Sequence, residues 1–320
     1  MTAIRGAAAA VTGAASGIGR ALALELSARG CDLALADRDE AGLQTLAAEI
    51  AKAGLQKVSF HRVDVSEPGQ IEEFAQAATS AHPGLNIVVN NAGVALFGQF
   101  NEIDHSQMDW LMNINFWGVV HATRAFLPHL ARQREAHIVN LSSIFGIIAP
   151  PGQTAYAAAK FAVRGFSESL RHELQMAKSP VKLSVVHPGG VATNIVRNSR
   201  TGVGMTDNAR RAQSIERFDA VAKTTPAAAA QRIIKGIENN QPRILIGNDA
   251  SLSARHLLGG ACAPDRADGE RGKDLSLRGA ISRSSRRSLR QRGDPWPASF
   301  VLAEAVSRAV PKTAWGLWVP

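Results

Sequence analysis

The chain has 320 residues, a formal net charge of +9 and 45% apolar residues. These values fit one large α/β domain or two small ones and exclude a disordered chain or a coiled coil, and no apolar run approaches the roughly 18 residues of a membrane span. Without a cleavable signal at the N-terminus, we expect a cytoplasmic protein with no membrane span.

Residues 1–250 alternate short apolar runs with longer helical patterns, which is typical of repeated βαβ units. Helices are expected at residues 19–29 and 41–53, and another should begin at Pro226 with Thr225 as its cap. This order predicts a doubly wound Rossmann-type α/β fold, with helices on both faces of a seven-stranded parallel sheet and ligands at the carboxyl ends of the strands. The predicted strands are residues 7–11, 33–36, 58–63, 87–89, 138–141, 183–186 and 244–246.

A glycine-rich turn joins the first predicted strand to the first helix. Gly13 permits a tight turn, Gly17 lets backbone N–H groups approach a pyrophosphate, and Gly19 lets the helix pack close to the strand. Asp37 ends the second strand, where a carboxylate can accept a hydrogen bond from a ribose hydroxyl. This context predicts a dinucleotide site.

The residues around Asp37 bear on the choice between NAD and NADP. Asp37 would repel a 2′-phosphate and favours NAD, whereas Arg38 could bind that phosphate and favours NADP; the glycine turn offers no second cation, so NAD is the preferred prediction. Asp64 and Val65 are expected beside the adenine, although an aspartate at a strand end is equally often a turn former. The amide-rich run of residues 90–93 is expected to tie strand ends together beneath the cofactor.

The single tyrosine, Tyr156, stands four residues before Lys160, which puts both side chains on one face of a predicted helix. A phenol with a pKa near 10 is a poor base at neutral pH, but a neighbouring cation stabilises the phenolate and lowers that pKa. Thirteen residues before Tyr156 a predicted strand ends in Ser142 and Ser143. The cluster indicates acid–base chemistry on a substrate oxygen.

In order and spacing, these motifs resemble those of the short-chain dehydrogenase/reductase family, and the likeness covers residues 5 to about 250. It implies a compact single-domain enzyme that transfers hydride between NAD(P) and an alcohol or ketone. Tyr156 would then exchange the proton with the substrate oxygen, Lys160 would lower its pKa, and Ser143, rather than Ser142, would bind that oxygen. The motifs that carry the resemblance are the glycine turn, the 90–93 run, Asn115, Ser143, Tyr156, Lys160 and the His187-Pro188-Gly189 run.

The same resemblance implies further contacts. Asn115, with Asn113 as the second choice, would hold a water of a proton relay to Lys160. Pro188 and Gly189 would close over the nicotinamide, and Thr193 would contact its carboxamide. The residues assigned to the cofactor are Gly13, Ser16, Gly17, Ile18, Gly19, Asp37, Arg38, Asp64, Val65, Asn91, Ala92, Gly93, Tyr156, Lys160, Pro188, Gly189, Val191 and Thr193.

His187 is a second candidate for acid–base chemistry, but its place at a strand end before Pro188 favours local packing or hydrogen bonding. The histidines share no metal spacing, and the two cysteines give neither a disulfide framework nor a metal motif, so we expect no metal site.

The positions expected around the reacting carbon are apolar, which favours a neutral secondary alcohol or ketone over a hydroxy acid or sugar phosphate, although these residues also suit plain core. The long polar segment 190–224 is expected to form a substrate lid. A nucleotide-sugar epimerase would need a different glycine spacing, and a catalytically inactive nucleotide sensor would usually lack Tyr156 or Lys160. The expected substrate positions are Ala95, Leu96, Ile144, Phe145, Ile147, Ile148, Gly190, Val191, Ile195 and Val196.

Residues 251–320 carry a net charge of +6 of the total of +9 and lack helical or strand periodicity. We therefore expect a basic tail, disordered from about residue 260, on a catalytic domain of residues 1–250, and no nucleic-acid partner. The helix that carries Tyr156 continues through Phe161, Val163, Phe166 and Leu170, more apolar surface than one sheet face requires. This surplus predicts a homodimer or homotetramer.

Overall fold

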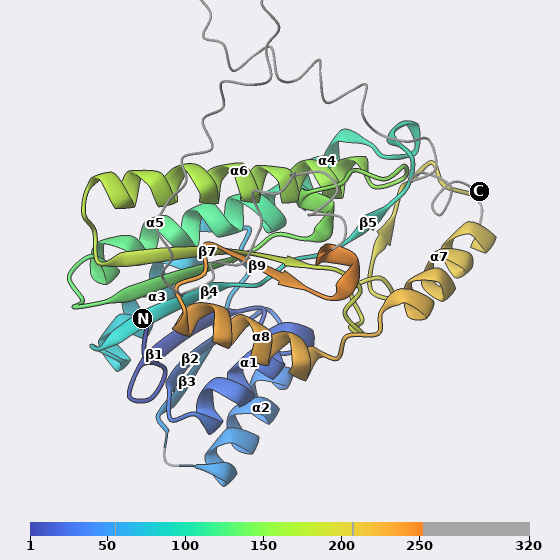
Figure 1. Cartoon of the computed structure of the whole chain (residues 1–320). Helices are drawn as coiled ribbons and strands as arrows, with labels where there is room; N and C mark the ends of the chain where they lie inside the picture. Colours follow the sequence, from blue (N-terminus) through green and yellow to red (C-terminus); the bar gives the residue numbers. More distant parts are fainter. Residues whose placement is uncertain (55, 207, 252–320) are drawn as a thin grey trace, which may run out of the picture. The chain divides into compact units, whose positions relative to one another are not determined.

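The computed structural model describes residues 1–251 except 55 and 207. A parallel sheet of seven strands in the order β3-β2-β1-β4-β6-β7-β9 lies at the centre of this part of the chain (Figure 1). All seven strands were predicted, with ends that differ by at most two residues. Their bounds are β1 Ala8–Thr12, β2 Asp32–Asp37, β3 Val58–Arg62, β4 Leu85–Asn90, β6 Ala136–Leu141, β7 Val181–Pro188 and β9 Arg243–Ile246.

Helices cover both faces of the sheet (Figure 1). On one face α1, α2 and α8 bury leucine and isoleucine side chains such as Leu26, Leu46 and Ile233, and on the other α3, α5 and α6 bury side chains such as Phe74 and Phe126. The fold is therefore the predicted doubly wound arrangement. The helices are α1 Gly17–Ala28, α2 Glu40–Ala53, α3 Pro68–Ala81, α4 His105–Met112, α5 Gly118–Leu130, α6 Thr154–Met176, α7 Asn208–Val221 and α8 Pro226–Glu238.

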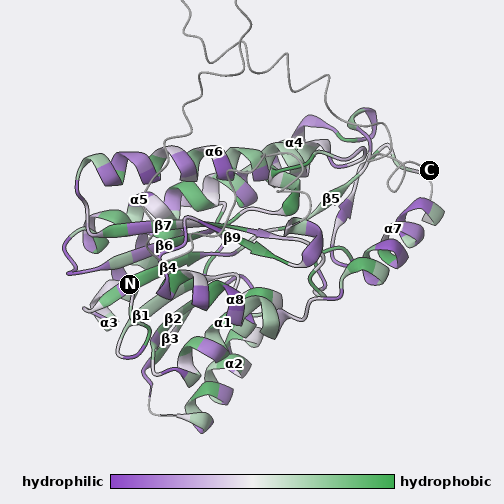
Figure 2. Cartoon of the chain, viewed as in Figure 1, coloured by the Kyte–Doolittle hydropathy of each residue, from purple (hydrophilic) through white to green (hydrophobic). Residues whose placement is uncertain are grey.

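The central strands are apolar on both faces because both faces are covered by helices. Every residue of β1 and β6 is buried. Figure 2 shows the hydrophobic colour along the central strands, whereas α6 carries much hydrophilic colour. The continuous apolar runs that predicted the strands thus follow from the layered architecture.

The predicted cap of α8 is confirmed. The Thr225 hydroxyl accepts a hydrogen bond of 3.1 Å from the Ala228 N–H, and Pro226 is the first residue of the helix. A proline at this position loses no hydrogen bond, since the first N–H groups of a helix have no partner within it. This cap fixes where the chain leaves segment 190–224.

Segment 190–224, expected to be a polar loop, contains a helix and a short strand. Helix α7 (Asn208–Val221) has few apolar residues, so its sequence lacks an amphipathic stripe. Strand β8 (Arg200–Thr201) pairs with β5 (Leu96–Phe97) in a second, two-stranded sheet. Strands of two residues carry no periodicity that sequence reasoning could detect.

No helix within residues 1–251 that the structure describes has both the length and the apolar composition needed to cross a membrane. The predicted disorder and basic charge after residue 260 lie outside the described residues.

Candidate active site

The glycine turn has the backbone geometry that its sequence predicts. Gly13 and Gly17 have φ values of +66° and +55°, in the left-handed region that favours glycine. A Cβ on Gly19 would lie 2.1 Å from the Gly13 carbonyl oxygen, so only glycine lets α1 approach β1 this closely. The turn and the start of α1 are thereby fixed against the end of β1.

The N-terminal end of α1 is suited to an anion. Ser16 is its N-cap residue, is exposed, and makes no capping hydrogen bond through its side chain. The N–H groups in the first turn of a helix lack partners within the helix, and the helix dipole favours negative charge there. Ile18, half-buried, packs against the core below this end. The residues present therefore fit a dinucleotide pyrophosphate.

The Asp37 carboxylate is held at the end of β2 by two backbone groups. It accepts hydrogen bonds from the Ala15 N–H at 3.0 Å and from the Asp39 N–H at 3.1 Å. Arg38 is exposed, and the parallel pairing of β2 with β3 places Arg62, also exposed, opposite Asp37 in the register. Sequence reasoning missed Arg62 as a second cation near this carboxylate, because only the pairing of the two strands brings it there.

Asp64 has the turn-forming role that was one of its two predicted roles. Its carboxylate accepts hydrogen bonds from the Ser66 N–H at 2.9 Å and the Ser66 hydroxyl at 2.6 Å. The neighbouring Val65 is buried against Gly118, where an added Cβ would lie 3.0 Å from Val65 Cγ2. The adenine contact of both residues stays a prediction.

The amide-rich run after β4 ties neighbouring strand ends together, as expected. The Thr12 hydroxyl accepts hydrogen bonds from the N–H groups of Asn91 and Ala92, and the Asn91 amide donates to the carbonyls of Thr12 and Gly13. A Cβ on Gly13 would lie 2.7 Å from the Ala92 Cα, so the two loops touch. This contact fixes the loop after β4 beside the glycine turn.

Tyr156 and Lys160 lie on successive turns at the start of α6. The Lys160 Nζ is 5.7 Å from the centroid of the Tyr156 ring and donates a hydrogen bond of 3.0 Å to the Leu141 carbonyl. Phe145 meets the tyrosine ring edge-on, with 6.1 Å between the centroids. Lys160 is buried, and burial lowers its pKa to about 8.

Ser143, not Ser142, faces the tyrosine. The Ser143 side chain is hydrogen-bonded to Tyr156, which acts to lower the pKa of the phenol, but burial has the larger effect and raises that pKa to about 12. The Ser142 hydroxyl instead donates to the Lys160 carbonyl at 2.7 Å, which fastens α6 to the end of β6. The phenol is therefore protonated at neutral pH in this state of the protein.

Asn115 lies in a π-helical turn, η2 (Asn113–Trp117), between α4 and α5. Its buried side chain accepts from the Val94 N–H at 2.8 Å and donates to the Val94 carbonyl at 2.9 Å, whereas Asn113 is exposed. A Cβ on Gly93 would lie 3.2 Å from Asn115 Oδ1 and 3.5 Å from Lys160 Nζ. The side chains of Asn115 and Lys160 therefore both lie next to Gly93. Such π-turns are frequent at functional sites.

The loop after β7 is fixed by a residue that sequence reasoning missed. The Asp249 carboxylate accepts a hydrogen bond of 2.7 Å from the Gly190 N–H, and a Cβ on Gly189 would lie 2.1 Å from Asp249 Oδ1. At the other end of the loop, the Thr193 methyl group would lie 3.3 Å from a Cβ on Gly17. The sequence feature that could have identified Asp249 is its position just after β9, at the same edge of the sheet as the other site residues.

The apolar positions expected around a substrate divide into two groups. Leu96 and Val191 belong to buried core clusters, and Ile147 and Gly190 are also buried, so these four have the alternative role as core. The half-buried positions keep the substrate prediction. They are Ala95, Ile144, Phe145, Ile148, Ile195 and Val196.

Within the described part of the chain, no three His, Cys, Asp or Glu side chains gather in a way that could hold a metal ion.

Known proteins resemble this chain over most of its length. A family model described as short chain dehydrogenase matches residues 7–204. The putative oxidoreductase SadH of Mycobacterium tuberculosis is 42% identical over 250 residues, which cover 78% of this chain and 89% of that protein. The dehydrogenase/reductase SDR family member 7B of Xenopus tropicalis is 30% identical over 241 residues, 74% of this chain and 75% of its own length.

A solved structure extends the similarity to the fold. A short chain dehydrogenase/reductase from Burkholderia phymatum, in complex with NAD, is 31% identical and superposes with a TM-score of 0.73. The match covers 80% of this chain and 94% of that one.

Proposed function

This chain belongs to the short-chain dehydrogenase/reductase family of oxidoreductases, and from that membership we propose that it interconverts a neutral, mainly apolar secondary alcohol and its ketone with NAD(P). The observation that carries the proposal is the cluster of Tyr156, Ser143 and a buried Lys160 at the carboxyl end of the sheet. Tyr156 acts as the general acid or base, and residues 1–250 form the catalytic domain. The cytoplasm is its proposed location.

The chain's own residues handle the proton. When bound, the nicotinamide ring of the cofactor accepts or supplies the hydride. Tyr156 takes the hydroxyl proton of the alcohol as the ketone forms, or returns it in the reverse direction, and Ser143 hydrogen-bonds the same substrate oxygen. The Lys160 ammonium stabilises the phenolate, and Asn115 continues the proton path behind it.

The preferred cofactor is NAD. Support comes from the Asp37 carboxylate, which two backbone N–H groups hold at the end of β2, where it would accept from a ribose hydroxyl and repel a phosphate. Arg38 and Arg62 oppose this preference, since both are exposed near the same strand ends. We give the carboxylate more weight than the two arginines because hydrogen bonds to backbone N–H groups fix its position.

Replacing Tyr156 by Phe tests the proposal directly. The change removes one hydroxyl and the proton path but leaves the cofactor pocket intact, so turnover should fall by about three orders of magnitude or more with NAD binding retained. Activity would be measured with NAD and NADP on a panel of neutral secondary alcohols that includes cyclohexanol, and NAD binding by calorimetry. Thr154→Val removes an exposed hydroxyl from the same turn of α6 and should be without effect.

Comparable turnover in Tyr156→Phe and the wild type would contradict the assignment of Tyr156. NAD binding without dehydrogenase activity on any alcohol or ketone would favour the alternative, a catalytically weak nucleotide-binding sensor or scaffold on the same fold.

An exposed aromatic patch supports a homodimer or homotetramer. Trp117 on η2 and Phe161 on α6 are 46% and 39% exposed, and these two elements meet where Phe116 packs edge-on against Phe166 at 6.3 Å. Monomers rarely expose such large apolar side chains together. Light scattering at micromolar concentration should give a mass of at least two chains.

A further inference from the structure

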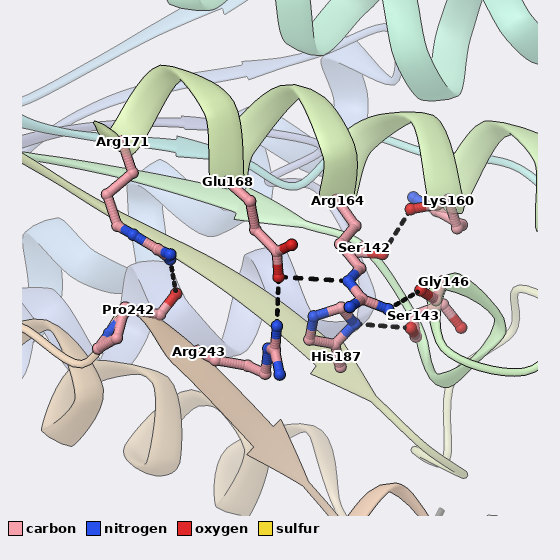
Figure 3. Close-up of polar contacts among 10 residues, drawn as sticks. All are labelled: Ser142, Ser143, Gly146, Lys160, Arg164, Glu168, Arg171, His187, Pro242 and Arg243. Atoms are coloured by element: carbon pink, nitrogen blue, oxygen red, sulfur yellow. Dashed lines mark hydrogen bonds and ion pairs between the residues drawn. The ribbon is translucent and has the colours of Figure 1, made fainter. Parts of the chain in front are cut away.

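The imidazole of His187 is buried directly behind the catalytic serine. His187 lies near the end of β7, is 0% exposed, and its Nδ1 lies 2.9 Å from the carbonyl oxygen of Ser143 (Figure 3). A carbonyl can only accept, so Nδ1 carries the hydrogen. In the neutral ring Nε2 then bears a lone pair, and this atom has no hydrogen-bond partner among residues 1–251 as described.

The hydrogen bond from His187 to Ser143 lies just beyond the last backbone hydrogen bond between β6 and β7. The last backbone hydrogen bond between β6 and β7 runs from the Ser142 N–H to the Val186 carbonyl, at 2.9 Å. The chain then leaves the sheet in the short helix η3 (Ile144–Gly146), where the Gly146 N–H also donates to the Ser143 carbonyl. With His187 as second donor, both lone pairs of this carbonyl are engaged.

The hydroxyl of the same serine is the group that meets Tyr156. Its oxygen also accepts a hydrogen bond of 3.1 Å from the Phe145 N–H. Since the carbonyl and the side chain belong to one residue, a rotation of the Ser143 backbone would move the hydroxyl away from the tyrosine. The His187 bond opposes that rotation.

Charged groups face His187 from the two elements packed against β7. Arg164 and Glu168 of α6 form an ion pair with 3.2 Å between Nε and Oε1, and Arg243 of β9 pairs with the same carboxylate (Figure 3). Arg164 also donates to the Gly146 carbonyl at 3.3 Å, on the same short helix. The pKa of His187 is lowered to about 4. Burial is the main cause, and the positive charges of the two guanidinium groups add to it.

With this lowered pKa the ring is neutral near pH 7 and does not carry a proton there. An apolar side chain at this position would avoid burying the unpaired Nε2, so what the imidazole contributes is the Nδ1–H bond. Sequence reasoning had favoured local hydrogen bonding over acid–base chemistry for His187, and the structure shows that bond.

We propose that His187 is a positioning residue for Ser143, holding the serine hydroxyl against Tyr156 through the hydrogen bond from Nδ1 to the Ser143 carbonyl. His187 touches neither substrate nor cofactor in this role. The inference rests on the proposed function, since it concerns the same serine and tyrosine.

Two variants of similar polarity form a matched test. In His187→Asn the amide nitrogen takes the place of Nδ1 and keeps the donor, whereas in His187→Gln it takes the place of the remote Nε2 and loses it. We expect His187→Asn to stay within about threefold of the wild-type kcat for cyclohexanol, and His187→Gln to lose about tenfold. The KM and the NAD dissociation constant should change by less than about twofold in both.

A second measurement does not depend on turnover. The chain has one tyrosine, so a ring-labelled protein gives a single ζ-carbon resonance that reports the ionisation of Tyr156. The hydrogen bond from Ser143 lowers the pKa of this phenol. With NAD present, the resonance should therefore titrate at higher pH in His187→Gln than in the wild type and in His187→Asn.

Three results would overturn the inference. The first is a His187→Gln enzyme whose kcat and tyrosine titration equal those of the wild type. The second is an equal loss of kcat in both variants accompanied by a loss of NAD binding, which would mean that the histidine only supports the fold. If His187→Gln does not fold, His187→Val supplies the donor-free comparison on a strand, and wild-type behaviour of that variant is the third. An inactive wild type would contradict the proposed function alone, because the ζ-carbon comparison still decides the role of His187.

Discussion

Tyr156 and Lys160 show how one environment shifts two pKa values in opposite directions. Burial penalises the charged form of each group, so the pKa of the phenol rises to about 12 and that of the ammonium falls to about 8. Both shifts work against the phenolate and ammonium pair that the proposed mechanism requires. An additional positive charge close to the phenol would restore the phenolate, and oxidised NAD carries one on its nicotinamide ring.

The ζ-carbon resonance of Tyr156 should therefore respond to NAD. In the protein alone it should stay constant up to about pH 10, and with saturating oxidised NAD it should titrate well below pH 10, because a nearby cation stabilises the phenolate. Lys160→Met should raise the titration midpoint measured with NAD. A midpoint at or above pH 10 in the wild type with NAD would contradict the role of Lys160.

Asp37 is expected to set the choice of cofactor. In Asp37→Ser the carboxylate is lost while Arg38 and Arg62 remain, so the ratio of kcat/KM for NADP to that for NAD should rise by at least about tenfold. Arg62→Gln in the same background should reverse part of this gain. A wild-type enzyme that already favours NADP would show that the two arginines outweigh the carboxylate.

At the scale of elements, the site exists because β1, β2, β4, β6, β7 and β9 all end at one edge of the sheet. The strands were predictable, since helices cover both faces and leave long apolar runs. Helix α7 and the β5–β8 pair were not, because a polar helix has no stripe and two-residue strands have no period.

The sequence predicts only those residues of the candidate site that belong to one short motif. Gly13 and Asn91 follow strand ends directly, and Tyr156 and Lys160 stand four residues apart on one helix. Asp249 and Arg62 act across strands that are distant in sequence, and no spacing brings them to the site.

Asp249, just after β9, binds the loop after β7, and this contact can be tested. Asp249→Ala removes the acceptor of the Gly190 N–H and frees the loop expected to cover the nicotinamide, so the NAD dissociation constant should rise by about tenfold. Asp249→Asn keeps one acceptor oxygen and should lie between this variant and the wild type, while the exposed Glu72→Gln on α3 serves as the control. Calorimetry measures all four proteins, and unchanged affinity in Asp249→Ala would remove the loop from NAD binding.

For the whole molecule, buried histidines link stability to pH. His137 is fully buried between the hydroxyls of Thr2 and Ser184, and burial lowers its pKa to about 3. The unfolded chain binds this proton near pH 6.5, so the stabilisation is complete above that pH and is lost as pH falls toward 3. His187, with its pKa of about 4, acts in the same direction.

The free energy of unfolding in urea should therefore fall between pH 6.5 and 5. His137→Gln should make this dependence shallower, by an amount that grows toward about 1.4 kcal/mol per pH unit, the contribution of one proton, as the pH approaches 5. His105→Gln, at an exposed position of α4, should leave it unchanged. Equal slopes in all three proteins would mean that His137 is not neutral in the folded chain.

The π-helical turn at Asn113–Trp117 has a consequence for changes in chain length. It accommodates one residue more than an α-helical turn would, and Asn115 reaches Val94 only in that register. Deleting a single residue from this turn would restore α-helical geometry and leave α4 and α5 in register with each other, but it would remove the wide turn that carries Asn115. A deletion here should therefore cost the two contacts of Asn115 with Val94 while it spares the packing of both neighbouring helices.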